Sequence, residues 1–269
     1  MTVTEALLAG ILQGAAEFLP ISSSGHLSLL HAFFGGNAED LTFDILLHLS
    51  TLFAVLIVYF KDISSLFPSF LSLCVKLLKG RFHLSEYSAE ERTVVCLFFG
   101  TIPLAAAFFI KDTVEIFSDY PRVIGALLLI NSIMLLLGER FKGKGNIFDM
   151  TRRDAFAVGV FQLLAVFPGI SRSGSTITGG SFMGLLHSEA VRFSFLLSVP
   201  AVIGANITNI SAVSKVSAEN ALPYLVGMAA AFLSGMAAIK LLLFITERSN
   251  FRVFSYYCAF IGALAIAFG

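Results

Sequence analysis

The chain contains little charge. Asp, Glu, Lys and Arg together make up 13% of its 269 residues, and 18 basic residues balance 18 acidic ones. This neutral balance gives no support for a nucleic-acid partner, which requires a basic surface. With 57% hydrophobic residues and 28 Phe, and a mean hydropathy of +0.85, the composition excludes an ordinary soluble domain. We therefore expect an integral membrane protein.

Two other features that the sequence lacks bear on metal binding and on a cleaved signal peptide. The three cysteines, Cys74, Cys96 and Cys258, are scattered without the spacing of metal ligands, so we expect them to fill apolar space. No Lys or Arg precedes Lys61, and Glu5 lies near the start. We therefore expect no positively charged head of a cleaved signal peptide.

A fourteen-residue phrase occurs twice. Residues 13–26 read QGAAEFLPISSSGH and residues 162–175 read QLLAVFPGISRSGS, with seven identities at an offset of 149. The first copy has Glu17 and His26, whereas the second has Arg172 opposite Ser23. The similarity continues, after a one-residue slip, from FDILL to FSFLL. We predict one membrane domain over residues 1–269, built from a first repeat at 1–138 and a second at 150–269.

Long apolar runs predict an all-α polytopic fold. Six runs can cross a bilayer core, which takes about 20 apolar residues. Two more stretches, 5–35 and 154–187, are interrupted by the repeated phrase. We expect each to form a re-entrant helix-turn-helix, since unwound backbone at membrane depth must be buried in protein or line a wet cavity. The six predicted spans are residues 43–60, 93–110, 122–138, 192–210, 221–243 and 252–268.

Lys and Arg predict the orientation through the positive-inside bias. Twelve lie in the connections at 61–92 and 139–153 and near residue 248, and three lie in the opposite connections. The first two connections should be cytoplasmic, with both termini outside. The spans of the two repeats then run in opposite senses, so that the repeats are inverted and both phrases meet near the midplane. Residues 64–79 should form an amphipathic helix on the cytoplasmic surface.

The predicted meeting point favours an anionic ligand. Each phrase leaves a helix, turns through Ser and Gly, and begins another helix, so hydroxyls and free N–H groups collect at a helix N-terminus, where phosphate binds. Arg172 adds a fork of donors that fits phosphate oxygens. Charge at this depth is costly, so Glu17 and Arg172 are functional candidates, with a purely structural ion pair as the alternative. We expect a phosphate group carried by a membrane-resident molecule.

These residues resemble the undecaprenyl-pyrophosphate phosphatases of the bacitracin-resistance type. Two motifs carry the resemblance: Glu/Gln-x-x-x-Glu, here Gln13 to Glu17 leading into FLPISSSGH, and PGxSRSxxT, here Pro168 to Thr176. Many members have Glu where this chain has Gln13, which argues against an essential acid there. The resemblance implies removal of the terminal phosphate of undecaprenyl pyrophosphate at the outer face of the bacterial plasma (inner) membrane. The product would serve envelope-polymer synthesis, and bacitracin, which sequesters the substrate, would be countered.

The resemblance and the site chemistry together suggest roles. We expect Ser23 to attack the terminal phosphorus and His26 to accept its proton and later to act as the base for water. Arg172 and helix N-terminal amides would stabilise the developing charge. Glu17 would orient His26 or hold a divalent cation, Mg²⁺ or Ca²⁺, with most other ligands from the substrate. His48 is expected only to line a helix interface. The predicted substrate-binding residues are Gln13, Ser22, Ser24, Ser171, Ser173 and Thr176.

Transport is the main alternative function. Inverted repeats with broken helices are typical of secondary transporters, so the chain could flip polyprenyl phosphate lipids. A flippase should tolerate Ser23→Ala far better than loss of Arg172, and a structural subunit should tolerate both. The sequence leaves open the prenyl chain length, the metal, the oligomeric state, and whether a phosphoserine forms or water attacks directly.

Overall fold

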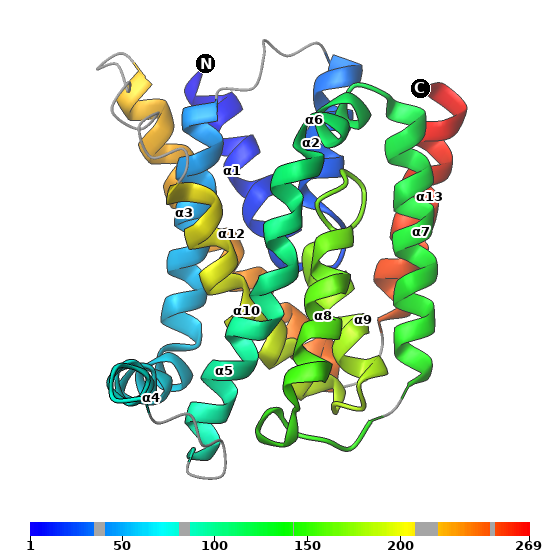
Figure 1. Cartoon of the computed structure of the whole chain (residues 1–269). Helices are drawn as coiled ribbons and strands as arrows, with labels where there is room; N and C mark the ends of the chain where they lie inside the picture. Colours follow the sequence, from blue (N-terminus) through cyan, green and yellow to red (C-terminus); the bar gives the residue numbers. More distant parts are fainter. Residues whose placement is uncertain (35–40, 81–86, 142, 208–219, 248–250) are drawn as a thin grey trace.

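The structure, a computed structural model, describes residues 1–34, 41–80, 87–141, 143–207, 220–247 and 251–269. These residues form a bundle of helices without a β-strand (Figure 1), and one isolated β-bridge joins Gly145 to Leu185. The elements are α1 (Val3–Phe18), α2 (Ser23–Phe34), α3 (Leu41–Val58), α4 (Phe60–Leu78), α5 (Ala89–Thr101), η2 (Ile102–Ala106), α6 (Ala107–Ser118), α7 (Pro121–Arg140), η3 (Ile147–Asp149), α8 (Arg152–Leu164), α9 (Arg172–Phe182), α10 (His187–Ile207), α12 (Ala221–Glu247) and α13 (Arg252–Phe268).

The predicted all-helical, polytopic class is confirmed. By length and composition, the described residues contain four helical segments that can cross a membrane, namely Ala89–Ile110, Pro121–Arg140, His187–Ile207 and Ala221–Thr246. A fifth is added if α3 and α4 count as one span, although they are bent by 90°. The predicted span at 252–268 forms α13, a shorter apolar helix of 17 residues. The last residues of the predicted span 192–210 lie outside the described residues.

Both interrupted stretches form a helix, a turn and a second helix. The first pair is α1 and α2, and the second is α8 and α9. Each turn contains a residue whose backbone angle cannot continue an α-helix: Ser22 has φ +72° and Gly169 has φ +109°. Two serines at equivalent repeat positions then begin the second helices, because Ser22 Oγ accepts from Gly25 N at 3.2 Å and Ser171 Oγ from Gly174 N at 3.1 Å. Each phrase therefore stops one helix and caps the next.

Glycines allow the first helix of each pair to lie directly against a neighbour. A Cβ at Gly10 of α1 would come within 2.2 Å of the Gly227 carbonyl oxygen of α12, and one at Gly159 of α8 within 2.3 Å of the Gly100 oxygen of α5. Gly10 and Gly159 are 149 residues apart, which is the offset of the repeated phrase. These backbone contacts hold α1 against α12 and α8 against α5, and so help to place the two turns that follow.

The two ends of the helical bundle are built from different parts of the chain. Both termini lie at one end, and α4 crosses the opposite end (Figure 1). The predicted surface helix at 64–79 falls almost entirely within α4, whose Lys76 Nζ lies 2.7 Å from the Glu91 carboxylate of α5. The three cysteines are free thiols, and two of them, Cys96 and Cys258, are buried.

Candidate active site

A cavity of about 450 Å³ lies where the two turns meet. The α1–α2 pair with its turn contributes Glu17 and three serines, and the α8–α9 pair with its turn contributes Ser171 and Arg172. Helices α3 and α10 complete the wall. The lining residues are Ala16, Glu17, Ser22, Ser23, Ser24, Asp44, Ile45, His48, Leu104, Gln162, Ala165, Val166, Ile170, Ser171, Arg172, Ala201, Val202, Ala205 and Asn206.

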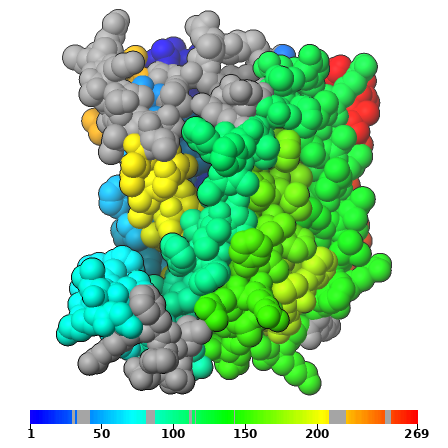
Figure 2. Space-filling view, viewed as in Figure 1, coloured from blue at the N-terminus to red at the C-terminus, as the bar shows by residue number. Residues whose placement is uncertain are grey.

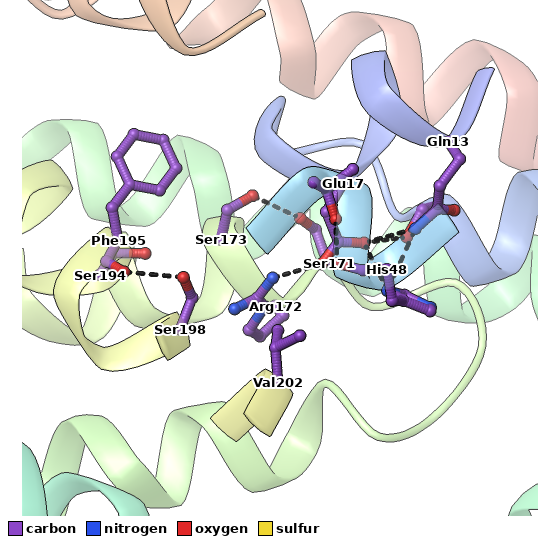
Figure 3. A network of polar contacts seen from close by, with 12 residues as sticks. Gln13, Glu17, His48, Ser171, Arg172, Ser173, Ser194, Phe195, Ser198 and Val202 are labelled. Carbon is purple, nitrogen blue, oxygen red and sulfur yellow. Dashed lines mark hydrogen bonds and ion pairs between the residues drawn. The ribbon is translucent and has the colours of Figure 1, made fainter. Parts of the chain in front are cut away.

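Glu17 is the centre of the polar network (Figure 3). Its Oε1 pairs with Arg172 Nη2, which comes from the other repeat. Its Oε2 accepts from Ser23 Oγ at 3.0 Å and from Gln13 Nε2 at 3.0 Å. The carboxylate is 7% exposed, so these donors replace the water that it has lost. One acid thus holds together the predicted nucleophile and the predicted anion-binding group.

The two turns are also joined through their backbones. Ser22 Oγ accepts from Gly169 N at 3.1 Å, in addition to capping α2. Asn131 of α7 bridges the turns, since its Nδ2 donates to Pro20 O at 3.0 Å and its Oδ1 accepts from Ser171 N at 3.0 Å. Asn131 is fully buried. These bonds hold both turns in one relative position, as a preorganised site requires.

The other predicted substrate-binding residues divide into two groups. Ser22, Ser24 and Ser171 line the cavity, and Ser24 is exposed. Ser173 and Thr176 do not: Ser173 Oγ donates to Leu19 O at 3.3 Å, and Thr176 Oγ1 lies 2.8 Å from Arg172 O and 2.6 Å from Ser194 Oγ. Both are buried, like the residues around them in α9, and their hydroxyls bond to protein atoms. Gln13 acts on Glu17 and does not line the cavity.

The predicted contact between Ser23 and His26 is not formed. His26 Nδ1 lies 2.8 Å from Ser22 O, and Nε2 lies 2.9 Å from Tyr257 OH. A carbonyl oxygen only accepts, so Nδ1 carries the proton and Nε2 accepts from the tyrosine. The ring also stacks on Tyr257 with centroids 5.5 Å apart. His26 therefore faces α13 and does not line the cavity.

A different histidine lies at the site. His48 of α3 lines the cavity, with Nδ1 3.2 Å from Gln13 Nε2 and 3.7 Å from Glu17 Oε2. Because the Gln13 amide nitrogen donates, Nδ1 accepts and the ring proton is on Nε2. The side chain is 40% exposed. His48 was expected only to line a helix interface; it also lines this cavity, as does Asp44, four residues before it on the same face of α3.

Arg172 has one hydrogen-bonding group to spare. Its Nη2 pairs with Glu17, whereas its buried Nη1 has no hydrogen-bond partner among the described residues. The arginine is also the first residue of α9, whose N-terminus faces the turn. An unpaired guanidinium donor beside helix N–H groups fits one or more oxygens of a phosphate.

The described residues offer few protein ligands for a metal ion. The described part of the chain contains no group of three or more His, Cys, Asp or Glu side chains that could hold a metal ion. Both oxygens of Glu17 already accept from neighbours. The residues present therefore do not fit a resident cation, and one that arrived with a pyrophosphate would take most of its ligands from phosphate and water.

Comparison with known proteins agrees with these features. A family model described as "Bacitracin resistance protein BacA" matches residues 6–264. An undecaprenyl-diphosphatase of Alkaliphilus metalliredigens is 39% identical over 100% of this chain and 99% of its own length. A protein of the same description from Methanosphaera stadtmanae is 38% identical, over 99% of this chain and 98% of its own. Another from Thermosipho africanus is 35% identical over 98% of this chain and 99% of its own.

Proposed function

Since the chain belongs to the bacitracin resistance protein BacA family, we propose that it is an undecaprenyl-diphosphatase. It hydrolyses the terminal phosphate of undecaprenyl pyrophosphate, and the undecaprenyl phosphate serves cell-envelope polymer synthesis. Turnover of the pyrophosphate also confers resistance to bacitracin, which sequesters this substrate. The observation that carries the proposal is the meeting of Ser23 and Arg172, from different repeats, on Glu17 beside one cavity.

Ser23 is the proposed nucleophile. Its Oγ already donates to Glu17 Oε2 at 3.0 Å, so the carboxylate can take the proton as Oγ bonds to the terminal phosphorus. The bond between that phosphorus and the bridging oxygen breaks, and undecaprenyl phosphate leaves. Water then attacks the phosphoserine, the phosphorus–Oγ bond breaks as Glu17 returns its proton to Ser23 Oγ, and inorganic phosphate leaves. Arg172 compensates the charge on the phosphoryl oxygens in both steps.

We assign the second proton transfer to His48. Its ring is half-exposed on the cavity and lies 3.7 Å from Glu17 Oε2. It can therefore accept the proton of the cavity water that attacks the phosphoserine. His26 becomes a positioning residue, because its bond to Ser22 O holds the residue directly before the nucleophile.

A divalent cation, Mg²⁺ or Ca²⁺, is proposed to enter with the substrate. Such a cation neutralises pyrophosphate charge, and its protein contacts are limited by the carboxylates that the cavity offers, Glu17 and Asp44. The cation acts on the charge of the substrate, and the proton transfers assigned to Ser23, Glu17 and His48 do not pass through it.

We further propose inverted repeats in a bacterial plasma membrane, with the site open to the outer side. Residues 1–138 and 150–269 form the two repeats of one domain. The matching close contacts of Gly10 and Gly159 support this relationship. The excess of Lys and Arg between residues 61 and 92 and between 139 and 153 supports a cytoplasmic position for that end. Both termini then lie outside.

Phosphate release from undecaprenyl pyrophosphate by the purified full-length chain in detergent, with Mg²⁺, tests the enzyme against the flippase. We expect release by the wild-type chain and its loss in Ser23→Ala and Arg172→Ala variants that remain folded. Arg172→Lys, which keeps the charge but loses the fork, should retain a small fraction. Absence of release by folded wild-type protein would refute the phosphatase, and lipid flipping in liposomes would then be measured.

A further inference from the structure

A second cavity of about 330 Å³ opens among α4, α5 and α10. These elements are visible on the face shown in Figure 2, where α4 projects at the lower left and α10 lies above it. The lining is apolar apart from one threonine hydroxyl. The lining residues are Ile63, Leu66, Phe67, Phe70, Val94, Leu97, Phe98, Thr101, Leu196, Val199 and Pro200. We call this cavity the α4–α5–α10 groove.

The groove continues the first cavity along the same two chain segments. On α10, Val199 lines the groove and Val202, three residues later on the same side of the helix, lines the catalytic cavity. Along α5 the groove ends at Thr101, and the catalytic cavity begins at Leu104, three residues later. A molecule held in the catalytic cavity can therefore extend between α5 and α10 into the groove.

Both segments are irregular at this level. Helix α5 ends at Thr101 and continues as the 3₁₀ helix η2, which contains Pro103, while α10 contains Pro200. A proline inside a helix removes a backbone hydrogen bond and pushes away the preceding turn, and a 3₁₀ segment changes the pitch. The two helices thus depart from regular packing where one cavity passes into the other.

We propose that the α4–α5–α10 groove binds the polyprenyl chain of the substrate whose pyrophosphate occupies the catalytic cavity. This inference rests on the proposed function and adds a second binding subsite to it. Contact with a hydrocarbon chain lowers the free energy of an apolar surface, but the acyl chains of membrane lipids offer the same contact. The substrate has the advantage that its head is already bound, so that its chain reaches the groove at a high effective concentration.

The test compares two substrates on groove variants of the full-length chain. Val199→Phe fills the groove, and Ile203→Phe makes the same kind of change one turn further along α10, at a residue that is 41% exposed and lines neither cavity. Phosphate release is measured with undecaprenyl pyrophosphate and with the short-chain farnesyl pyrophosphate. We expect Val199→Phe to lower the preference in kcat/KM for the long chain about tenfold through KM, and Ile203→Phe to leave it unchanged.

Equal rates for Val199→Phe and wild type with the long substrate would overturn the proposal. An equal loss of kcat/KM with both substrates in folded protein would also overturn it, because the groove would then not distinguish the long prenyl chain from the short one. A photoreactive diazirine on the prenyl chain gives an independent readout, and it should label α5 and α10 at the groove. This labelling needs no turnover, so it tests the subsite even if wild-type protein releases no phosphate and the phosphatase proposal fails; labelling elsewhere overturns the groove alone.

Discussion

Replacing Glu17 by Gln should separate catalysis from substrate binding. The change keeps the side-chain shape but removes the base for Ser23 and the charge that pairs with Arg172. Loss of a general base lowers kcat by about 10²–10⁴-fold, or about 3 to 5 kcal/mol of transition-state stabilisation. Arg172, released from its ion pair, remains available to phosphate, so KM should stay level or fall.

The same variant also loses stability. Breaking a buried ion pair costs about 3–5 kcal/mol because one charge is left without its partner. Arg172 is 19% exposed beside the cavity and can turn toward water, so we expect the lower end, about 3 kcal/mol. Thermal unfolding in detergent checks this value. Glu139→Gln is the matched control, because Glu139 pairs with Arg252 Nε at 3.0 Å outside the cavity, and its kcat should stay at the wild-type value.

A double-mutant cycle decides whether Glu17 and Ser23 act as one unit. Residues that work together in one step are strongly non-additive. Glu17→Gln combined with Ser23→Ala should therefore be no slower than Ser23→Ala alone, measured as steady-state phosphate release. A kcat for Glu17→Gln within about threefold of wild type, or losses that multiply in the double variant, would refute the proton transfer from Ser23 to Glu17.

Three further outcomes follow from the structure. His48→Gln should lower kcat about 10-fold to 100-fold, because the imidazole no longer accepts a proton at the cavity, whereas Tyr257→Phe, which removes a hydroxyl outside the cavity, should have a much smaller effect; a wild-type kcat in His48→Gln argues against this role. Gly10→Ala should reduce the free energy of unfolding by about 1–3 kcal/mol through overpacking on α12, while Gly204→Ala, where a Cβ meets nothing within 4 Å, should not; equal thermal stability would contradict the α1–α12 contact. Chelation by EDTA should slow phosphate release without lowering the unfolding temperature, since the cation arrives with the substrate; a lower unfolding temperature would indicate a resident metal.

The helical class and the broken helices were readable from the sequence. Apolar runs near 20 residues predict membrane helices directly, and the Pro, Gly and Ser of the repeated phrase stop one helix and cap the next. The match between two distant phrases also pointed to a shared site containing Glu17 and Arg172. These signals are local, so they need no knowledge of packing.

Side-chain direction was not readable in this way. Ser23 and His26 are three residues apart on α2. This spacing cannot predict that both ring nitrogens of His26 bond elsewhere, to Ser22 O and Tyr257 OH. The place of His48 depends on how α3 packs beside α1, which is a tertiary property. The 90° bend between α3 and α4 and the groove that α4 forms with α5 and α10 depend likewise on contacts between distant segments.

A crystal structure of the full-length chain with tungstate, a heavy-atom analogue of phosphate, tests most directly whether the two turns form one phosphate site. Anomalous scattering locates the anion independently of the protein coordinates. We predict one tungstate with oxygens about 3 Å from Ser23 Oγ and from the Arg172 guanidinium. Tungstate bound to only one of the two turns, or outside the cavity that they share, would contradict the shared site.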